Sequence, residues 1–308
     1  MISIGNLTTG GTGKTPFSIW VTQQLHQLGI QPAIISRGYG ASKKAVGADG
    51  QTKNDEAMEI EARLPGIVQL QDPDRVAIAR TAVQEHSVQA IVLDDGFQHR
   101  RLARDLDLVL IDATCPFGFE HLLPRGLLRE PVQSLARADA VVITRSELVT
   151  DQCIEEIKSR VHRHANIPVA VVETVPCGWL SNRTEDADGD PNQPLSFLAT
   201  KKLYSFCAIG NPSAFQQTMK NISDQIQSPL VGHRSFPDHH LFTDVEIREL
   251  VDGANAASAE AMVCTHKDLV KLDSSSMEPL PLFALVIGIA FREGENELLE
   301  LLARTVID

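Results

Sequence analysis

Basic residues are scarce in this chain of 308 residues. Lysine and arginine number 28 against 40 aspartates and glutamates, which gives a formal net charge of −12 at pH 7. A surface of this charge repels the phosphate backbone of nucleic acids, so an anionic ligand must be met by a local cluster of cations. We therefore expect small molecules or lipids as ligands, and no nucleic acid.

Paired cysteines and long apolar runs are also missing. The five cysteines are isolated, odd in number and without CxxC spacing, which is typical of reduced thiols in a cytoplasmic protein. The longest apolar run, residues 281–291, is too short to cross a bilayer, and no secretory leader precedes the first apolar segment. These absences predict a cytoplasmic chain without a transmembrane segment.

A glycine-rich loop stands close to the N-terminus. It follows a short apolar run at residues 2–4 and precedes a helical pattern at residues 16–28. A loop that cradles phosphate needs glycines so that backbone N–H groups can face oxygens, a lysine for the β- and γ-phosphates, and a hydroxyl for Mg²⁺. Thr8 departs from the motif, which usually has glycine there. The predicted nucleotide-binding residues are Thr8, Thr9, Gly10, Gly11, Thr12, Gly13, Lys14 and Thr15.

Two adjacent acids follow the apolar run at residues 90–93. Asp94 and Asp95 would repel each other without a cation, and carboxylates at a strand tip beside a phosphate loop can hold Mg²⁺ or its waters. With the hydroxyl of Thr15 they form the predicted metal site. The implied cofactors are ATP and Mg²⁺.

Several other polar residues permit two interpretations. The basic cluster at residues 99–104 either receives an anionic substrate or forms a solvated helix face. Asp55 begins a helical pattern, and from the residues alone a capping role is favoured over a catalytic one. His239 suits proton handling or a capping turn before the helix at Thr243. Metal binding by His233, His239 and His240 is not expected, because they lack the spacing of a zinc pair.

Strands alternate with helices along the chain. This pattern predicts an α/β fold in which a mostly parallel sheet, of the P-loop NTPase type, has helices on both faces. The composition changes after residue 173, so we expect a P-loop core at residues 1–172 and a smaller α/β domain at 173–308 that contributes to the substrate cleft. The predicted strands are 2–4, 31–35, 67–70, 90–93, 106–111, 138–144, 168–173, 203–209, 230–231, 261–265 and 282–289.

Six motifs in this order resemble those of the tetraacyldisaccharide 4′-kinase family, the lipid A 4′-kinases. The resemblance extends from Gly5 to at least Lys271, and the Thr8 departure is shared with the family. The motifs are Gly5–Pro16, Ser36–Gly40, Asp55–Glu56, Asp94–His99, Leu128–Pro131 and Phe236–His240.

The resemblance implies a reaction and a set of roles. The γ-phosphate of ATP passes to the 4′-hydroxyl of a tetraacylated, 1-phosphorylated glucosamine disaccharide, forming lipid IVA, and a second domain joined by a hinge closes on nucleotide. The implied catalytic residues are Asp55 as general base, His239 as its support, and Lys14, Asp94 and Asp95. The implied substrate residues are Arg75, His99, Arg129 and Glu130.

The resemblance also implies peripheral contact with the cytoplasmic face of the inner membrane. Members of the family usually carry a membrane-inserting helix ahead of the phosphate loop, whereas this sequence begins at the strand of that loop. Two interpretations follow: either the true start lies upstream of Met1, or this version contacts the membrane without that helix.

A rival prediction is a P-loop ATPase switch of the partitioning type, which also has a GGxGKT loop. Such proteins typically carry a signature lysine at the place that Thr9 holds here. The sequence therefore favours the kinase.

Overall fold

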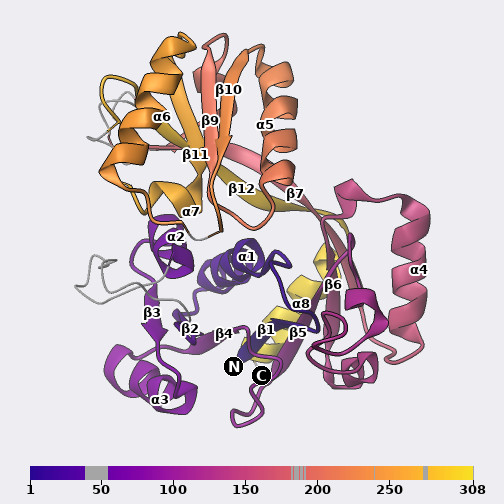
Figure 1. Ribbon diagram of the computed structural model, residues 1–308. Coiled ribbons are helices and arrows are strands. Elements are labelled where there is room, and N and C mark those ends of the chain that lie inside the picture. The colour runs from indigo at the N-terminus through magenta and orange to yellow at the C-terminus, as the bar shows by residue number, and fades with distance from the viewer. Residues whose placement is uncertain are drawn as a thin grey trace. The chain divides into compact units, whose positions relative to one another are not determined.

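The computed structural model describes residues 1–38, 55–181, 183, 187, 190, 192–238, 240–272 and 277–307, without the side chains of Asp55 and Ile307. The chain forms two compact units (Figure 1). Unit 1 comprises Met1–Ala41, Ile60–Val175 and Gly288–Asp308, and unit 2 comprises Ser42–Glu59 and Pro176–Ile287. The predicted division after residue 172 stays a prediction. The two units differ from it in placing residues 42–59 in unit 2 and residues 288–308 in unit 1.

Unit 1 is built on a parallel sheet of strand order β3-β2-β4-β1-β5-β6-β7, in which each pair of neighbours runs in parallel. The predicted α/β fold with a mostly parallel sheet is confirmed. Strand β1 lies between β4 and β5, and ligands bind such sheets at the carboxyl ends of the strands where the winding reverses. The strands are β1 (Ile2–Asn6), β2 (Pro32–Ser36), β3 (Val68–Gln71), β4 (Ala90–Asp94), β5 (Leu106–Asp112), β6 (Ala140–Thr144) and β7 (Val169–Leu180).

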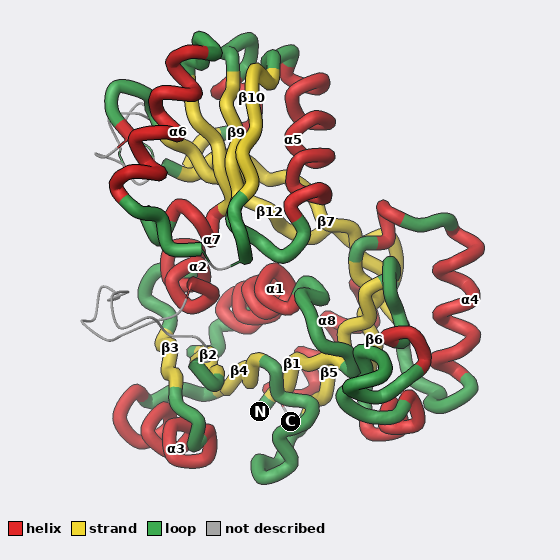
Figure 2. The backbone as a smooth tube through the Cα atoms, viewed as in Figure 1, coloured by secondary structure: helices red, strands yellow, loops and turns green. Residues whose placement is uncertain are grey.

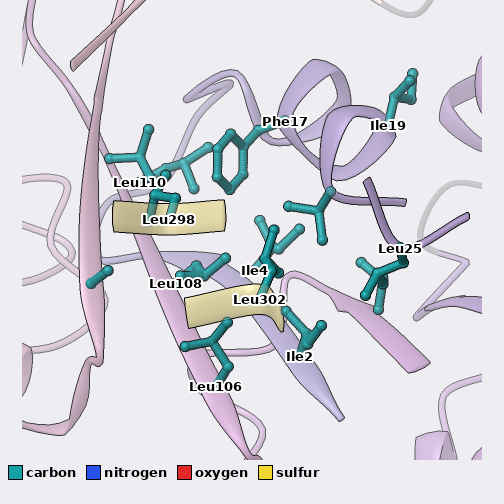
Figure 3. Close-up of a cluster of buried hydrophobic side chains, with 14 of the residues drawn as sticks. Ile2, Ile4, Phe17, Ile19, Leu25, Leu106, Leu108, Leu110, Leu298 and Leu302 are labelled. Carbon is teal, nitrogen blue, oxygen red and sulfur yellow. The ribbon is translucent and has the colours of Figure 1, made fainter. Parts of the chain in front are cut away.

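Helices cover both faces of this sheet, because alternate strand residues point to opposite sides. On one face, α1 (Lys14–Gln27) and α8 (Glu295–Ile307) pack on β1 and β5. Figure 3 shows Leu298 and Leu302 of α8 beside Leu106 and Leu108 of β5. On the other face lie α3 (Arg75–His86) and α4 (Asp151–His162).

Side-chain caps fix where several helices begin. Asp74 accepts hydrogen bonds from the first turn of α3, and Thr150 caps α4. Helix α1 differs, because its N-cap is Gly13 with no side-chain cap. Its first N–H groups therefore point outward without a side-chain acceptor. Helix α2 (Asp55–Arg63), which begins where the sequence predicts, has residues in both units. Unit 1 also contains the 3-10 helices Gly118–Glu120, Val132–Arg137 and Ser146–Leu148.

Unit 2 repeats the layered plan with a parallel sheet of order β10-β9-β11-β12, which Figure 2 shows with helices on its flanks. Helix α5 packs on one face and α6 on the other. The predicted helix start at Thr243 is confirmed, because Thr243 forms a capping box with Glu246. The elements are β8 (Asn192–Gln193), β9 (Leu203–Cys207), α5 (Pro212–Ile226), β10 (Leu230–Ser235), α6 (Asp244–Ala256), β11 (Ala261–Thr265), α7 (His266–Leu269) and β12 (Leu282–Glu293).

Three strands continue at least four residues past their predicted ends. Strand β10 reaches Ser235 instead of residue 231, and β7 and β12 are extended as well. The prediction ends the seventh strand at residue 173, where polar residues appear, but β7 continues to Leu180 because Trp179 is buried in the core of unit 2. Strand β12 likewise continues to Glu293, past the predicted end at residue 289. Strands β7 and β12 each have residues in unit 1 and in unit 2.

Candidate active site

The phosphate loop joins β1 to α1 in unit 1. Gly10 and Gly13 have φ of 106° and 81°, a backbone region that other residues rarely adopt. Since Gly13 is also the N-cap of α1 and offers no side-chain acceptor, the positive end of the helix dipole meets the loop directly. Loop and helix start together form an anion-binding site.

The loop is held from behind by side chains of the sheet. The amide of Asn6 donates to Oγ1 of Thr12 at 3.0 Å, and the hydroxyl of Thr144 donates to the carbonyl of Thr12 at 2.9 Å. Thr8 also has a local explanation, because its backbone pairs with Leu128 in an antiparallel bridge. Extended backbone suits a β-branched residue, so glycine is not needed there.

Asp95 follows β4 and pairs with two cations, Arg129 and Lys14. Nη1 of Arg129 lies 2.8 Å from both of its carboxylate oxygens, and Nζ of Lys14 lies 3.5 Å from Oδ1. Burial alone would raise the pKa of Asp95, but Lys14 and Arg129 outweigh it and hold the pKa below its ordinary value. The paired acids were expected to need a cation. For Asp95, Lys14 and Arg129 supply that positive charge.

Asp94 is the last residue of β4 and is half-buried. It accepts a hydrogen bond of 3.4 Å from the hydroxyl of Ser18 on α1. Gly96 lets the chain turn sharply after the two acids, because a Cβ there would lie 2.5 Å from Oγ of Ser3 on β1. The close crossing over β1 keeps the acids beside the phosphate loop.

Arg129 reaches Asp95 from a segment that is bonded to the phosphate loop. The N–H of Thr9 donates to the carbonyl of Leu127 at 2.8 Å, and the N–H of Arg129 donates to the carbonyl of Leu7 at 2.7 Å. Glu130 pairs instead with Arg137, at 2.9 and 3.1 Å, and the guanidinium of Arg137 lies over the ring of Phe97. The predicted role of Glu130 in lining the site stays a prediction.

Arg75 lies near the acids, and His99 lies near Arg75. Nη1 of Arg75, at the start of α3, donates to the backbone carbonyl of Asp95 at 3.0 Å. Burial lowers the pKa of His99, and the nearby guanidiniums of Arg75, Arg101 and Arg104 lower it further. Among the residues that the structure describes, Nε2 of His99 is buried and has no hydrogen-bond partner.

The basic cluster at residues 99–104 is not a helix face, because its backbone forms turns and bends. Arg104 is structural: it donates to the carbonyls of Gly96 and His99 at 3.1 Å and pairs with Asp107 at 3.0 Å. Arg101 is exposed, with Asp74 at 3.9 Å. Of this cluster, His99 lies close to Arg75, which in turn contacts the backbone of Asp95.

Arg145 is a cation beside the phosphate loop that the sequence analysis did not identify. It follows β6, has φ of 57° and forms an ion pair with Asp112 at the end of β5. A Cβ built on Gly11 would lie 4.0 Å from its Nη2. Asp112 also accepts from the N–H and hydroxyl of Thr114, at 2.9 and 2.7 Å, so its carboxylate has partners besides Arg145.

Comparison with known proteins agrees with this geometry. The sequence model of the family described as tetraacyldisaccharide-1-P 4′-kinase, LpxK, matches residues 1–306. The chain belongs to this family. Membership favours the kinase over the partitioning-type ATPase.

Relatives of this LpxK family chain cover most of its length. The tetraacyldisaccharide 4′-kinase of Anaeromyxobacter sp. (strain Fw109-5) is 38% identical and covers 97% of this chain and 80% of its own. The tetraacyldisaccharide 4′-kinase of Syntrophus aciditrophicus is 36% identical and covers 95% of this chain and 80% of its own length. The crystal structure of "apo" form LpxK from Aquifex aeolicus in complex with ATP has a TM-score of 0.73 and 28% identity, covering 99% of this chain and 88% of that one.

The predicted catalytic pair lies outside what the structure describes. Helix α2 begins at Asp55, but the side chain of Asp55 and all of His239 are not among the described residues. The base and cap interpretations of Asp55 therefore both stand. Among the described residues, no group of three His, Cys, Asp or Glu side chains is arranged to hold a metal ion by itself.

Proposed function

We propose that this LpxK family member transfers the γ-phosphate of ATP to the 4′-hydroxyl of tetraacyldisaccharide 1-phosphate, forming lipid IVA. The observation that carries the proposal is the shared carboxylate of Asp95, which holds the phosphate-loop Lys14 and Arg129 next to the N-terminus of α1. Phosphoryl transfer depends on positioning and on cations at the migrating group rather than on covalent chemistry. This site provides both.

ATP binds along residues 8–15, with the backbone N–H groups and Lys14 on its phosphates. The polyphosphate competes with Asp95 for the ammonium of Lys14, which lies only 3.5 Å from that carboxylate. When Lys14 turns to the phosphates, Arg129 still neutralises Asp95. The loop therefore exchanges one partner of Lys14 for another without leaving Asp95 unpaired.

Mg²⁺ fits the oxygen donors at this place. The hydroxyl of Thr15 and the carboxylates of Asp94 and Asp95 would hold it. Mg²⁺ commonly takes one or two carboxylates together with phosphate oxygens and waters, so a cage of three acids is not required. When bound, the ion neutralises charge on the β- and γ-phosphates.

The nucleoside leaves the loop on the side of β5 and β6. The β4 side is filled by Asp94, Asp95 and the cations around them, which serve the reacting phosphate and the acceptor. On the other side, Asp112 holds the guanidinium of Arg145 next to Gly11. A guanidinium is planar and stacks on aromatic rings, so Arg145 is placed to cover the adenine.

The acceptor approaches beside the acids, where Arg75, His99 and Arg129 are present and Glu130 follows. Asp55 removes the proton of the 4′-hydroxyl and His239 supports it, as the family resemblance implies. Because the acceptor carries four acyl chains, the chain contacts the cytoplasmic face of the inner membrane peripherally. None of the helices among the described residues has the length and apolar character of a membrane span.

The test is transfer of label from γ-labelled ATP, with Mg²⁺, to a panel of lipid A precursors. Label should appear only on a precursor whose 4′-hydroxyl is unsubstituted. Lys14→Ala should abolish transfer, because this cation is the one that the loop places on the phosphates. Arg304→Ala, which removes an exposed guanidinium on α8, is the matched control and should retain activity. Turnover by purified Lys14→Ala at the wild-type rate would contradict the proposal.

A further inference from the structure

Three large apolar side chains project from one short loop of unit 1. Phe119, Leu122 and Leu123, here called the apolar tip, are 69%, 47% and 52% exposed. They lie within five residues of each other on the segment that follows β5 and leads to Leu128. Single exposed apolar residues are ordinary, but a cluster of this kind marks an interaction surface.

The loop presents the apolar tip on a fixed backbone. The N–H of Leu127 donates to the carbonyl of Gly118 at 2.8 Å, and the N–H of Leu123 donates to the carbonyl of Leu128 at 2.9 Å. Phe119 itself has φ of 59°, which is unfavourable for an aromatic residue. A backbone strained in this way and closed by its own hydrogen bonds holds Phe119 outward instead of letting it fold onto the core.

Cations lie around the apolar tip, although the whole chain carries −12 and the nearby acids Glu155 and Glu156 of α4 line the same hollow as Arg160 and Arg163. The one acid in the loop between Phe117 and Arg129 is Glu120, and it forms an ion pair with Arg160. His121 and Arg163 lie near enough to lower the pKa of Glu120 further. Arg125, two residues after Leu123, is exposed. Exposed apolar groups bordered by cations complement the surface of an anionic bilayer.

The same loop is continuous with the active site. Leu128 bridges Leu122 on one side and Thr8 of the phosphate loop on the other. The next residue is Arg129, which holds Asp95. A few backbone hydrogen bonds therefore connect the apolar tip to the phosphate loop and to Arg129.

We infer that the apolar tip enters the interfacial layer of the bilayer and that His121, Arg125 and Arg163 face anionic headgroups. The inference rests on the proposed function, since an acceptor with four acyl chains is embedded in that bilayer. The apolar tip sets the side from which the phosphate loop and Arg129 approach the acceptor. The occupant is the lipid surface, not a second copy of this chain.

Vesicle sedimentation tests the inference without any chemistry. The full chain is mixed with vesicles of phosphatidylcholine alone, or with about one third phosphatidylglycerol. Phe119→Ser/Leu123→Ser should lower the partition coefficient about tenfold or more, because two apolar side chains no longer enter the bilayer. Val83→Ser, which changes an exposed apolar residue on α3, is the matched control and should bind as the wild type does. Arg125→Gln should weaken binding only to the anionic vesicles.

Kinetics separate this inference from the proposed function. The tip variant should keep the wild-type rate on acceptor dissolved in detergent micelles and lose activity on acceptor in vesicles. An inactive wild type would overturn the proposed function. The sedimentation experiment would still decide whether the apolar tip binds vesicles, because it measures no catalysis. Equal vesicle binding by the wild type and the tip variant would overturn the inference. So would a wild-type dimer that the tip variant abolishes, because the apolar tip would then be a protein interface.

Discussion

Arg129 and Asp95 form an ion pair in which one guanidinium nitrogen lies 2.8 Å from both carboxylate oxygens. Lys14 shares that carboxylate at 3.5 Å. A cation of the phosphate loop and a cation of a segment more than a hundred residues later therefore meet on one acid. How readily Lys14 turns to ATP depends on how well Arg129 satisfies Asp95.

The first prediction concerns this competition. Without Mg²⁺, in the presence of a chelator, Arg129→Ala should weaken ATP binding by about tenfold, because Asp95 then retains Lys14 more strongly. Asp95→Asn should bind ATP at least as tightly as the wild type, since it no longer competes for Lys14. Calorimetry on the two single variants and the double variant decides the matter. If the double variant binds as weakly as Arg129→Ala, the carboxylate is not what holds Lys14 back.

Arg145 gives a prediction that distinguishes the two ends of ATP. If it covers the adenine, Arg145→Ala should weaken ATP binding by about five- to thirtyfold and leave the binding of inorganic tripolyphosphate unchanged. Asp112→Asn should also weaken ATP binding, but by less, because Asp112 only orients the guanidinium of Arg145. Arg304→Ala is the control. An equal loss for ATP and tripolyphosphate would place Arg145 on the phosphates instead.

His99 predicts a dependence of stability on pH. Burial and three neighbouring guanidiniums lower its pKa in the folded chain below the value of about 6.5 expected in the unfolded chain. The unfolded state then binds more protons, so the contribution of His99 to the free energy of unfolding is present above about pH 6.5 and is lost as the pH falls through the folded pKa. His99→Gln should lose less stability than the wild type between neutral and acidic pH in denaturant titrations. His86→Gln, at the exposed end of α3, should behave as the wild type does, and parallel pH curves for His99→Gln and wild type would contradict the prediction.

Local patterns were sufficient to predict the phosphate loop and the acids. Asp94 and Asp95 stand at the end of β4, and Gly13 and Lys14 belong to the loop that joins β1 to α1, so their places at one edge of the sheet follow from the parallel topology. Thr8 is the exception. The reason for its departure from the motif is a bridge to Leu128, which cannot be predicted from the residues near Thr8.

The position of Arg145 beside the phosphate loop could not be predicted from sequence patterns. Its partner Asp112 is 33 residues away, and the two meet because Asp112 pairs in register with Thr144 across β5 and β6. A single arginine after an apolar strand has no signature of its own. The pairing of Glu130 with Arg137 depends on the 3-10 helix Val132–Arg137, which the sequence analysis did not predict.

The last prediction concerns Asp55, for which the cap and base interpretations give different results. If Asp55 only caps α2, Asp55→Asn should cost at most about 1 kcal/mol of stability and leave turnover nearly intact, since asparagine caps as well as aspartate. If Asp55 takes the proton of the 4′-hydroxyl, the same change should lower kcat by about 10²–10⁴-fold without loss of ATP affinity. His239→Ala should act in the same direction. Because residues that act as one unit are not additive, the double variant should lose much less than the product of the two single losses. Turnover at saturating ATP, measured for all three variants, separates the cases: a nearly active Asp55→Asn returns the residue to its capping role, and fully multiplicative losses mean that Asp55 and His239 act independently.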